Sequence, residues 1–387
     1  MTEFNITYCS KCLLPSTKPD LKFVNGVCSA CLNFEGRSVI DFESRAKEFV
    51  ELVKERSSKS ESKWDCLIPV SGGKDSTYQV LKILELGFNP LCVTATTCDL
   101  SSIGRENIEN IKQLGVDYIE FSPNKIVRRK LNKIGLTMVG DIAWPEHVGI
   151  FTIPVVMALK FKIPTLIWGE NSQNEYGGPD DASNTHKLDR RWLEEFGGLI
   201  GLRVSDLIGI LDLTEIDLAP YAYPSASELE EGQGILGIFL GHYFPWDGLD
   251  NYLIAKAHGL KTPNSVVEGS MVDYENLDNL QHGIHDYFKF LKYGYGRATD
   301  QVSMHIRRGR INRAVGLDIV KRVEGKFPAS YLGVPLKQIL DRIEVTEEEF
   351  KNICKKFTNT NLFKKDINSN FLMDSNGNLI KVNYDNP

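Results

Sequence analysis

Four cysteines near the N-terminus have the spacing of a metal site. Cys9, Cys12, Cys28 and Cys31 form the pattern C-x2-C-x15-C-x2-C. Each C-x2-C pair can place two thiolates on one turn, and two such turns complete a tetrahedron around Zn²⁺. Two disulfides or a redox role are the alternatives, and a reducing compartment disfavours disulfides. We therefore predict that residues 1–36 form a zinc ribbon with a closed, structural Zn²⁺ site.

A glycine-rich loop is the second motif that could do chemistry. Its residues are Ser71, Gly72, Gly73, Lys74, Asp75 and Ser76. The glycines let backbone N–H groups approach an anion, and a following helix would add the positive end of its dipole. Lys74 adds a mobile positive charge, and the two serines add hydroxyl donors. Asp75 would repel phosphate, so we expect it to hold Mg²⁺ or to cap the helix.

Alternating strands and helices predict how this loop is held. Short apolar runs at 66–70, 90–96, 118–121, 165–169 and 235–241 alternate with helical stretches at 76–86, 104–114, 149–161 and 247–258. That alternation is typical of βαβ units in a parallel sheet, which binds ligands at the carboxyl ends of its strands. Around it we expect a helix and linker over 37–63, and a mostly helical region over 263–387 that ends in a hairpin at Asn376-Gly377.

Composition narrows the class of protein. The 387 residues are 42% hydrophobic and 25% charged, with a net charge of 45 − 51 = −6. These values are ordinary for a globular protein and do not suggest a polyanion binder. No run of about 18 apolar residues is present, and the N-terminus lacks a signal-peptide pattern. We expect a cytoplasmic protein without a membrane segment.

The loop SGGKDS resembles the pyrophosphatase loop (PP-loop) of ATP-dependent adenylating enzymes, and a Walker A motif is absent. The resemblance implies an α/β fold over residues 64–262. Its five-stranded parallel sheet would have helices on both faces, as in adenine nucleotide alpha hydrolase-like proteins. It also implies ATP as cofactor, cleaved between its α and β phosphates. Adenine is then expected beside the second strand, and the cofactor contacts beyond the loop are Val93, Thr94, Ala95 and Gly169.

A second resemblance spans nearly the whole chain. The opening YCSKCLLPSTKPD, the loop SGGKDS, WGENSQNEYGG at 168–178, FLGHYFPWD at 239–247 and the stretch 285–313 are similar to N-acetyl sugar amidotransferases of the WbpG-like and PseA-like kind. These serve lipopolysaccharide O-antigen or nonulosonic-acid biosynthesis. The resemblance implies conversion of an acetamido group, on a nucleotide-linked sugar, into an acetamidino group through an O-adenylyl imidate.

Ammonia is expected from a separate protein. Class II glutaminases use a cysteine directly after the initiator, and Thr2 stands there. The resemblance implies a glutaminase partner of the histidine-biosynthesis type, together with a cyclase-like barrel that conducts ammonia.

Candidate site residues follow from these resemblances. Lys74, Asp75, Glu170 and Arg297 are the expected catalytic residues. The expected substrate contacts are Asn171, Glu175, Tyr176, Lys292, Asp300, Arg307, Arg308 and Arg310. A polar loop after residue 169, and a solvated helix face over 305–313, are the simpler interpretations of these residues. Asp247 is expected to be the N-cap of its helix.

One rival function stays open. Enzymes that thiolate tRNA also combine zinc ribbons with SGGKDS. Sulfur transfer usually needs reactive cysteines, but no C-x-x-C follows residue 31, and the negative net charge argues against nucleic acid. The seven histidines show no metal-binding pattern in the sequence, and we expect His242, His282 and His285 to be core or cap residues.

Overall fold

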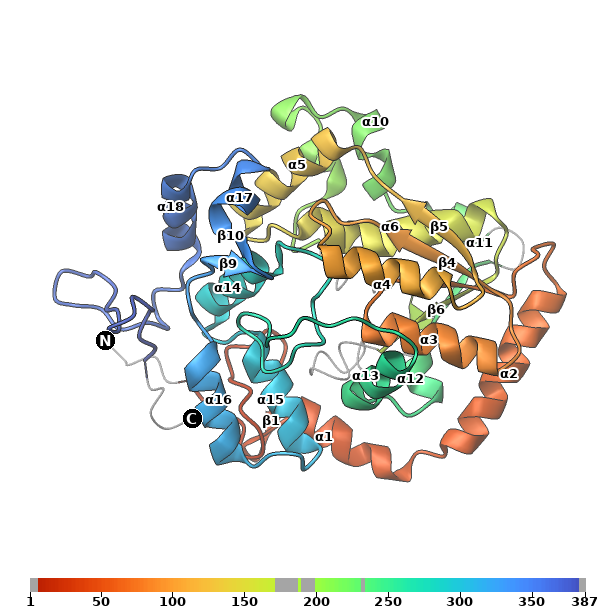
Figure 1. Cartoon of the computed structure of the whole chain (residues 1–387), viewed down its shortest axis with the longest axis horizontal. Helices are drawn as coiled ribbons and strands as arrows, with labels where there is room; N and C mark the ends of the chain where they lie inside the picture. Colours follow the sequence, from red (N-terminus) through yellow and green to blue (C-terminus); the bar gives the residue numbers. More distant parts are fainter. Residues whose placement is uncertain (1–5, 171–186, 189–198, 231–233, 383–387) are drawn as a thin grey trace.

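A mostly parallel sheet lies at the centre of the computed structural model (Figure 1). The structure describes residues 6–170, 187–188, 199–230 and 234–382. The sheet order is β5-β4-β3-β6-β8-β7, and β7 is the antiparallel edge strand. The strands are β3 (Cys66–Pro69), β4 (Pro90–Ala95), β5 (Asp117–Phe121), β6 (Thr165–Trp168), β7 (Lys187–Leu188) and β8 (Leu236–Phe239). The predicted five parallel strands are therefore confirmed, with β7 as an addition.

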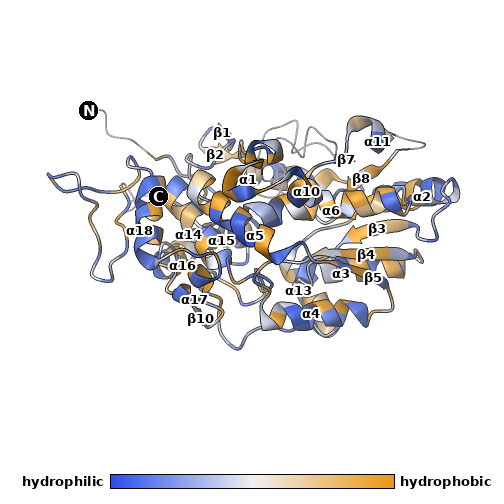
Figure 2. Ribbon diagram, turned by 90° about the horizontal axis from the view of Figure 1, so that it is seen from above, coloured by the Kyte–Doolittle hydropathy of each residue, from blue (hydrophilic) through white to orange (hydrophobic). Residues whose placement is uncertain are grey.

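Helices cover both faces of this sheet because its strands are apolar on both sides. Ile68 of β3 packs with Phe49 and Ile83 on one face, while Leu67 packs with Ile153 on the other. The first face is covered by α2 (Phe42–Ser58), α3 (Lys74–Glu85) and α4 (Ser102–Lys112), with α13 (Gly248–Ala257) against α3. The second face is covered by α6 (Trp144–Lys160). The hydrophobic colouring of β3 and β4 in Figure 2 agrees with this burial.

Two predicted boundaries are wrong. The last predicted strand ends at Phe239, because Leu240 begins the short helix α12 (Leu240–Tyr243). Helix α6 begins at Trp144 rather than near Gly149, so residues 144–147 form its first turn. Pro145 favours this early start, because proline is well tolerated in the first turn of a helix.

A buried ion pair fixes the start of α6 beside the end of β4. Arg128, on α5 (Lys125–Ile134), donates to Glu146 Oε1 over 3.0 Å and to the Thr96 carbonyl over 3.2 Å. Asn132 donates to the second Glu146 oxygen over 2.8 Å. Both charged side chains are less than one-tenth exposed. The carboxyl end of the sheet and the first turn of α6 are thereby held together.

The chain outside the sheet forms a second body of helices beside it. In Figures 1 and 2 the C-terminal helices lie at the opposite end of the molecule from the sheet. These elements are α14 (His282–Tyr293), α15 (Arg297–Arg307), α16 (Arg313–Val323), β9 (Ser330–Tyr331), β10 (Val334–Pro335), α17 (Leu336–Asp341) and α18 (Glu347–Phe357). Their core includes Phe288, Phe350 and Leu136, so this region packs onto the segment after α5. Gly377, at φ 79°, lies in the turn between the bridged residues Met373 and Leu379.

Several short elements complete the described chain. They are β1 (Phe23–Val24), β2 (Val27–Cys28), α1 (Ser29–Glu35), the 3₁₀ turn Gly36–Val39, the π-helical turn Gly135–Val139, the 3₁₀ turns Val204–Leu207, Ile210–Asp212 and Ala219–Tyr221, α10 (Glu215–Leu218) and α11 (Ala226–Glu230). Across the described residues, none of the helices has the length and apolar character needed to cross a membrane.

A substitution at Gly135 tests how tightly the turn before α6 is packed. A Cβ atom there would lie 2.4 Å from the Asp141 carbonyl oxygen and 2.8 Å from Trp144 Cβ. We expect Gly135→Ala to lower the free energy of unfolding by about 2–3 kcal/mol, because the backbone must move. The control is Gly149→Ala, whose Cβ would meet nothing closer than 3.6 Å. Urea denaturation should show the control unchanged or more stable by up to about 1 kcal/mol; equal losses in both variants would contradict the packing argument.

Candidate functional site

The loop SGGKDS joins the carboxyl end of β3 to the N-terminus of α3. Gly72 has φ 90°, and a Cβ atom there would lie 3.0 Å from the Ile108 nitrogen and 3.1 Å from the Asn107 carbonyl carbon. Only glycine fits this position without strain. Gly73 is the N-cap of α3 and provides no side-chain cap. The first N–H groups of α3 are therefore placed where an anion can reach them.

Lys74 is the charged centre of the loop. It is 8% exposed, and its Nζ lies 2.6 Å from Asp75 Oδ2 and 3.3 Å from Glu275 Oε1. Asn251 donates to the other Asp75 oxygen over 2.8 Å, and Gln301 donates to Glu275 Oε2 over 2.7 Å. Burial alone would raise the pKa of Glu275, but Lys74 and Arg297 outweigh burial and lower it below 4.5. The buried ammonium of Lys74 thus forms ion pairs with carboxylates from two parts of the chain.

The predicted catalytic residues come together in one cavity. A cavity of about 200 Å³ is lined by the loop and by Glu170, Tyr274, Glu275 and Arg297, among others. Lys74, Asp75, Glu170 and Arg297 therefore face a common space, although they come from the sheet and from the C-terminal region. Arg297 is oriented by Asp286, whose two oxygens lie 3.3 and 3.4 Å from its guanidinium nitrogens. Asp75 does not cap α3, since Gly73 stands at that position.

A larger cavity of about 990 Å³ lies next to this one, and Glu170 lines both. Aromatic rings and guanidinium groups share its wall: Phe34, Tyr78, Phe239, Phe244, Trp246, Arg37, Arg45, Arg308 and Arg310. Arg310 lies 2.7 Å from Asp247, and Arg308 also pairs with that carboxylate. Asp247 accepts from the Leu249 N–H over 2.8 Å, as the predicted N-cap of α13.

The other predicted residues are dispersed. Val93, Thr94 and Ala95 end β4, where the Thr94 hydroxyl donates to the Val70 carbonyl over 2.6 Å. Gly169 follows β6 and leaves room for the Trp246 ring, which a Cβ atom would meet at 3.0 Å. Each of the remaining predicted site residues either lines neither of these two cavities or falls outside the described residues.

Lys292, Asp300 and Arg307 line neither cavity. Lys292 donates to the Val139 carbonyl over 3.3 Å, and Asp300 pairs with Lys289. Their substrate roles stay predictions that the geometry does not support. Asn171, Glu175 and Tyr176 lie outside the described residues.

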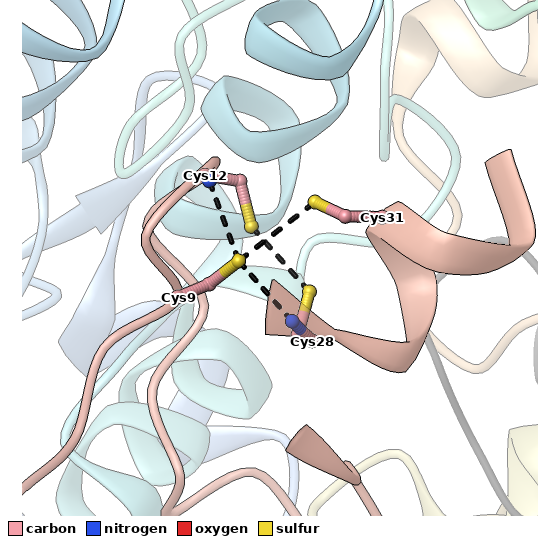
Figure 3. A group of neighbouring side chains, drawn as sticks. All are labelled: Cys9, Cys12, Cys28 and Cys31. Carbon is pink, nitrogen blue, oxygen red and sulfur yellow. Dashed lines mark hydrogen bonds between the residues drawn. The ribbon is translucent and has the colours of Figure 1, made fainter. Parts of the chain in front are cut away.

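The four N-terminal cysteines face one another (Figure 3). Cys9 and Cys12 come from one loop, and Cys28 and Cys31 lie at the start of α1. The Sγ atoms of Cys9 and Cys31 are 3.9 Å apart, and those of Cys12 and Cys28 are 3.7 Å apart. A tetrahedron with Zn–S bonds of about 2.3 Å has edges of about 3.8 Å. Buried, unbonded thiols at this separation fit Zn²⁺ and exclude disulfides.

The ribbon is fastened to the C-terminal helices. Leu13 packs with Val302 and Val320, and its N–H donates to Ser303 Oγ over 3.2 Å. Arg313 donates to the carbonyl oxygens of Cys12 over 3.2 Å and Cys9 over 3.4 Å. The loop that carries Cys9 and Cys12 is therefore attached to α15, the helix that begins with Arg297.

Sequence reasoning missed several residues of the site. Glu275 and Asn251, which hold Lys74 and Asp75, belong to no short motif. His147 and His285 both contact Asp141, although the two histidines are 138 residues apart in the sequence. Only the fold brings such residues together.

Metal analysis tests the ribbon. Elemental analysis of the purified protein should find one zinc ion per chain. We expect Cys28→Ser to lose most of this zinc and to unfold at a lower temperature, because three ligands hold the metal less tightly. Cys98→Ser, outside the ribbon, should keep the metal. Zinc retention in Cys28→Ser would contradict the assignment.

Acid titration tests the Lys74–Glu275 pair. Because the pKa of Glu275 is lower in the folded protein, its stabilisation is present above pH 4.5 and is lost as the pH falls toward the folded pKa. Glu275→Gln should be less stable than the unmodified protein by about 3 kcal/mol at pH 7. Urea denaturation should show this difference narrowing below pH 4.5. The exposed control Glu51→Gln should match the unmodified protein at every pH.

Comparison with known proteins agrees with part of this description. Residues 268–374 match the family model "LPS biosynthesis protein WbpG-like, C-terminal domain". No curated protein matches the chain. NMN synthetase from Francisella tularensis is 12% identical with a TM-score of 0.27, over 35% of this chain and 58% of that chain.

NH3-dependent NAD synthetase from Campylobacter jejuni, in complex with nitrate, is 14% identical with a TM-score of 0.29. The match covers 36% of this chain and 62% of that chain, so the chain spans less than two thirds of either solved protein. The segment that supplies Glu275, Asp286 and Arg297 lies within residues 268–374. Over those residues the chain is therefore similar to the C-terminal domain of WbpG-like LPS biosynthesis proteins.

Proposed function

We propose that this protein is an ATP-dependent amidotransferase that converts the acetamido group of a nucleotide-linked sugar into an acetamidino group. One observation carries the proposal: a loop built to bind phosphate is closed by Glu275 and Arg297 from the region that matches WbpG-like proteins. An enzyme of this kind needs an ATP site and a sugar site that meet. Glu170 lies where the two cavities meet.

The charged groups that line the smaller cavity suit ATP and Mg²⁺. The backbone of Ser71–Gly73, the N-terminus of α3, Lys74 and Arg297 would hold the phosphates. Asp75, Glu170 and Glu275 would hold Mg²⁺, which prefers carboxylate oxygens. The adenine would lie near the end of β4, at Val93–Ala95. When phosphate arrives, Lys74 can exchange part of its contact with Asp75 and Glu275 for the anion.

The chemistry needs positioning and neutralisation of charge rather than a covalent nucleophile. The amide oxygen of the acetamido group attacks the α-phosphorus, and pyrophosphate leaves with the electrons of the broken P–O bond. The product is an O-adenylyl imidate, from which AMP departs readily. Ammonia then adds to the imidate carbon, and the C–O bond to AMP breaks.

The larger cavity suits a nucleotide-linked sugar. Its volume of about 990 Å³ is at the upper end of ordinary ligand sites. Guanidinium groups recognise diphosphates through paired hydrogen bonds, and the aromatic rings offer surfaces for a base or a sugar. Arg308 and Arg310 already form ion pairs with one carboxylate, Asp247, and the same two guanidinium groups could bind a diphosphate.

A separate glutaminase would supply the ammonia, through a barrel-shaped partner that conducts it. The support comes from the thiols of the chain. All eight cysteines are described, and the four outside the ribbon are poor nucleophiles because burial raises each thiol pKa: Cys66 well above 9.0, Cys92 and Cys354 to about 12, and Cys98 to about 11. A glutaminase of the cysteine type needs a thiolate.

The same thiols disfavour the rival function. A tRNA-thiolating enzyme would need a reactive cysteine near the PP-loop to carry sulfur. Burial raises the pKa of every cysteine outside the ribbon, and the net charge is −6. Neither property suits sulfur transfer to a polyanion.

A reaction with purified protein tests the proposal. ATP, Mg²⁺, concentrated ammonium and a panel of UDP-linked di-N-acetylated sugars should give AMP and a sugar product lighter by about one mass unit, as expected when NH replaces oxygen at the positioned carbon. Lys74→Ala should lower this rate by at least about 100-fold, because it removes the phosphate charge partner. Lys47→Ala, on the exposed face of α2, should leave the rate unchanged. Absence of AMP with every sugar, together with copurifying RNA, would favour the rival function.

A further inference from the structure

The helix that follows the cysteine cluster forms part of the wall of the larger cavity. Cys28 is the N-cap of α1 and Cys31 lies in its first turn, so the cluster holds the start of this helix. Phe34, in the last turn of α1, lines the cavity of about 990 Å³, and Arg37 in the following 3₁₀ turn lines it too. The N-terminal ribbon therefore contributes a side chain to the cavity that the proposed function assigns to the nucleotide-linked sugar.

A series of contacts leads from the PP-loop to Phe34. A Cβ atom built on Gly248, the first residue of α13, would lie 3.4 Å from Lys74 Cε. Asp247, the N-cap of that helix, forms an ion pair with Arg308. The guanidinium carbon of Arg308 lies over the Phe34 ring, 5.3 Å from its centroid. The order of contacts outward from the PP-loop is thus Lys74, the start of α13, Arg308 and Phe34.

The same order describes a nucleotide-linked sugar, which consists of the sugar, a diphosphate and a nucleoside. The acetamido group must meet the α-phosphorus of ATP, so the sugar belongs beside Glu170, which lines both cavities. The guanidinium groups of Arg308 and Arg310 come next and can hold the diphosphate. A base linked to that diphosphate then reaches the Phe34 ring.

Exposure distinguishes Phe34 from most of the other aromatic rings in this wall. Four of those rings are less than one-tenth exposed and are packed into the protein: Tyr78, Phe239, Phe244 and Trp246. Phe34 and Phe42 are partly exposed, and Phe34 is the ring that lies against Arg308. A ring beside a phosphate-binding guanidinium is within reach of the base of the same ligand, and its face can stack on that base.

The charge of the cavity agrees with a diphosphate ligand. Three carboxylates line the cavity, from Glu170, Asp247 and Asp250. Five cationic side chains outnumber them: Arg37, Arg45, Lys82, Arg308 and Arg310. Because the whole chain carries a net charge of −6, this positive excess is local to the cavity. A cavity of this kind attracts an anion rather than an uncharged sugar alone.

We propose that the nucleoside of the substrate stacks on Phe34 while Arg308 and Arg310 hold its diphosphate, so that the N-terminal ribbon is part of the substrate site. This assignment rests on the proposed function. Asp247 neutralises the two guanidinium groups before the substrate arrives, and the diphosphate exchanges with part of that contact. The cysteine cluster then has a role in recognition, because it holds the helix that presents the ring.

Binding of nucleotides without a sugar tests the assignment directly. Calorimetric titration of the unmodified protein with UDP, CDP and GDP should show binding of at least one of them. Phe34→Ala and Phe34→Leu should weaken that binding by at least about tenfold, because the stacking face is lost. Phe34→Tyr keeps the ring and should bind within about threefold of the unmodified protein. Val39→Ala, at an 87% exposed position in the adjacent turn, should bind as the unmodified protein does.

Kinetics with the nucleotide-linked sugar provide a second measurement. Phe34→Ala should raise the KM for this substrate by at least about tenfold and change kcat by less than about threefold, because stacking is the same in the bound substrate and in the transition state. The KM for ATP should not change. Each variant should also retain the zinc content of the unmodified protein, which shows that the ribbon is folded.

Other outcomes would overturn the assignment. Failure of all three nucleotides to bind the unmodified protein would do so, as would unchanged binding in Phe34→Ala or a loss found in Phe42→Ala in its place. A higher KM for ATP would assign the ring to the ATP site. Amidine formation that is insensitive to Phe34 would leave the proposed function standing without this assignment. Nucleotide binding that depends on Phe34, with no amidine formed from any sugar, would support the nucleoside site and contradict the proposed function.

Discussion

The buried ammonium of Lys74 is the constraint on which the site depends. A charge that is removed from water needs counter-charges, and one of its carboxylates, Glu275, comes from a region about 200 residues further along the chain. Because Glu275 pairs with Lys74, the segment before α14 packs against the PP-loop. Arg297 lines the same cavity as the loop, and Asp286 orients it. The cavity at the PP-loop is therefore formed between two parts of the chain and belongs to neither alone.

Short-range patterns explain how much the sequence could predict. The cysteine spacing and SGGKDS place their own side chains, because each motif builds a turn from neighbouring residues. The periodicity of apolar residues was sufficient to predict the five parallel strands and the helices α3, α4 and α13. Glu275 and the two histidines could not be found in this way, since tertiary packing alone brings them together. A glutamate or a histidine in the sequence does not by itself indicate which distant residue it will contact in the fold.

The differences between prediction and structure also come from tertiary packing. Trp144–His147 contains polar and aromatic residues that suggest a loop, but Glu146 is buried against Arg128 and so belongs to a packed helix. The family resemblance implies substrate roles for Lys292 and Asp300, which lie close to Arg297 in sequence. On α14 and α15 they point to other neighbours, Val139 and Lys289. Sequence proximity within helices is a weak guide to a shared site, because side chains 100° apart face different surroundings.

Attachment of the ribbon to α15 and α16 has a consequence for biosynthesis. The ribbon is made first, yet the surface that receives Leu13 and the guanidinium that holds its carbonyl groups come about 290 to 300 residues later. During translation the ribbon leaves the ribosome early, whereas its apolar side stays uncovered until most of the chain has followed. Contacts of such long sequence separation form slowly. A chain truncated before α15 would therefore leave the apolar side of the ribbon exposed, and exposed apolar surface of this kind promotes aggregation.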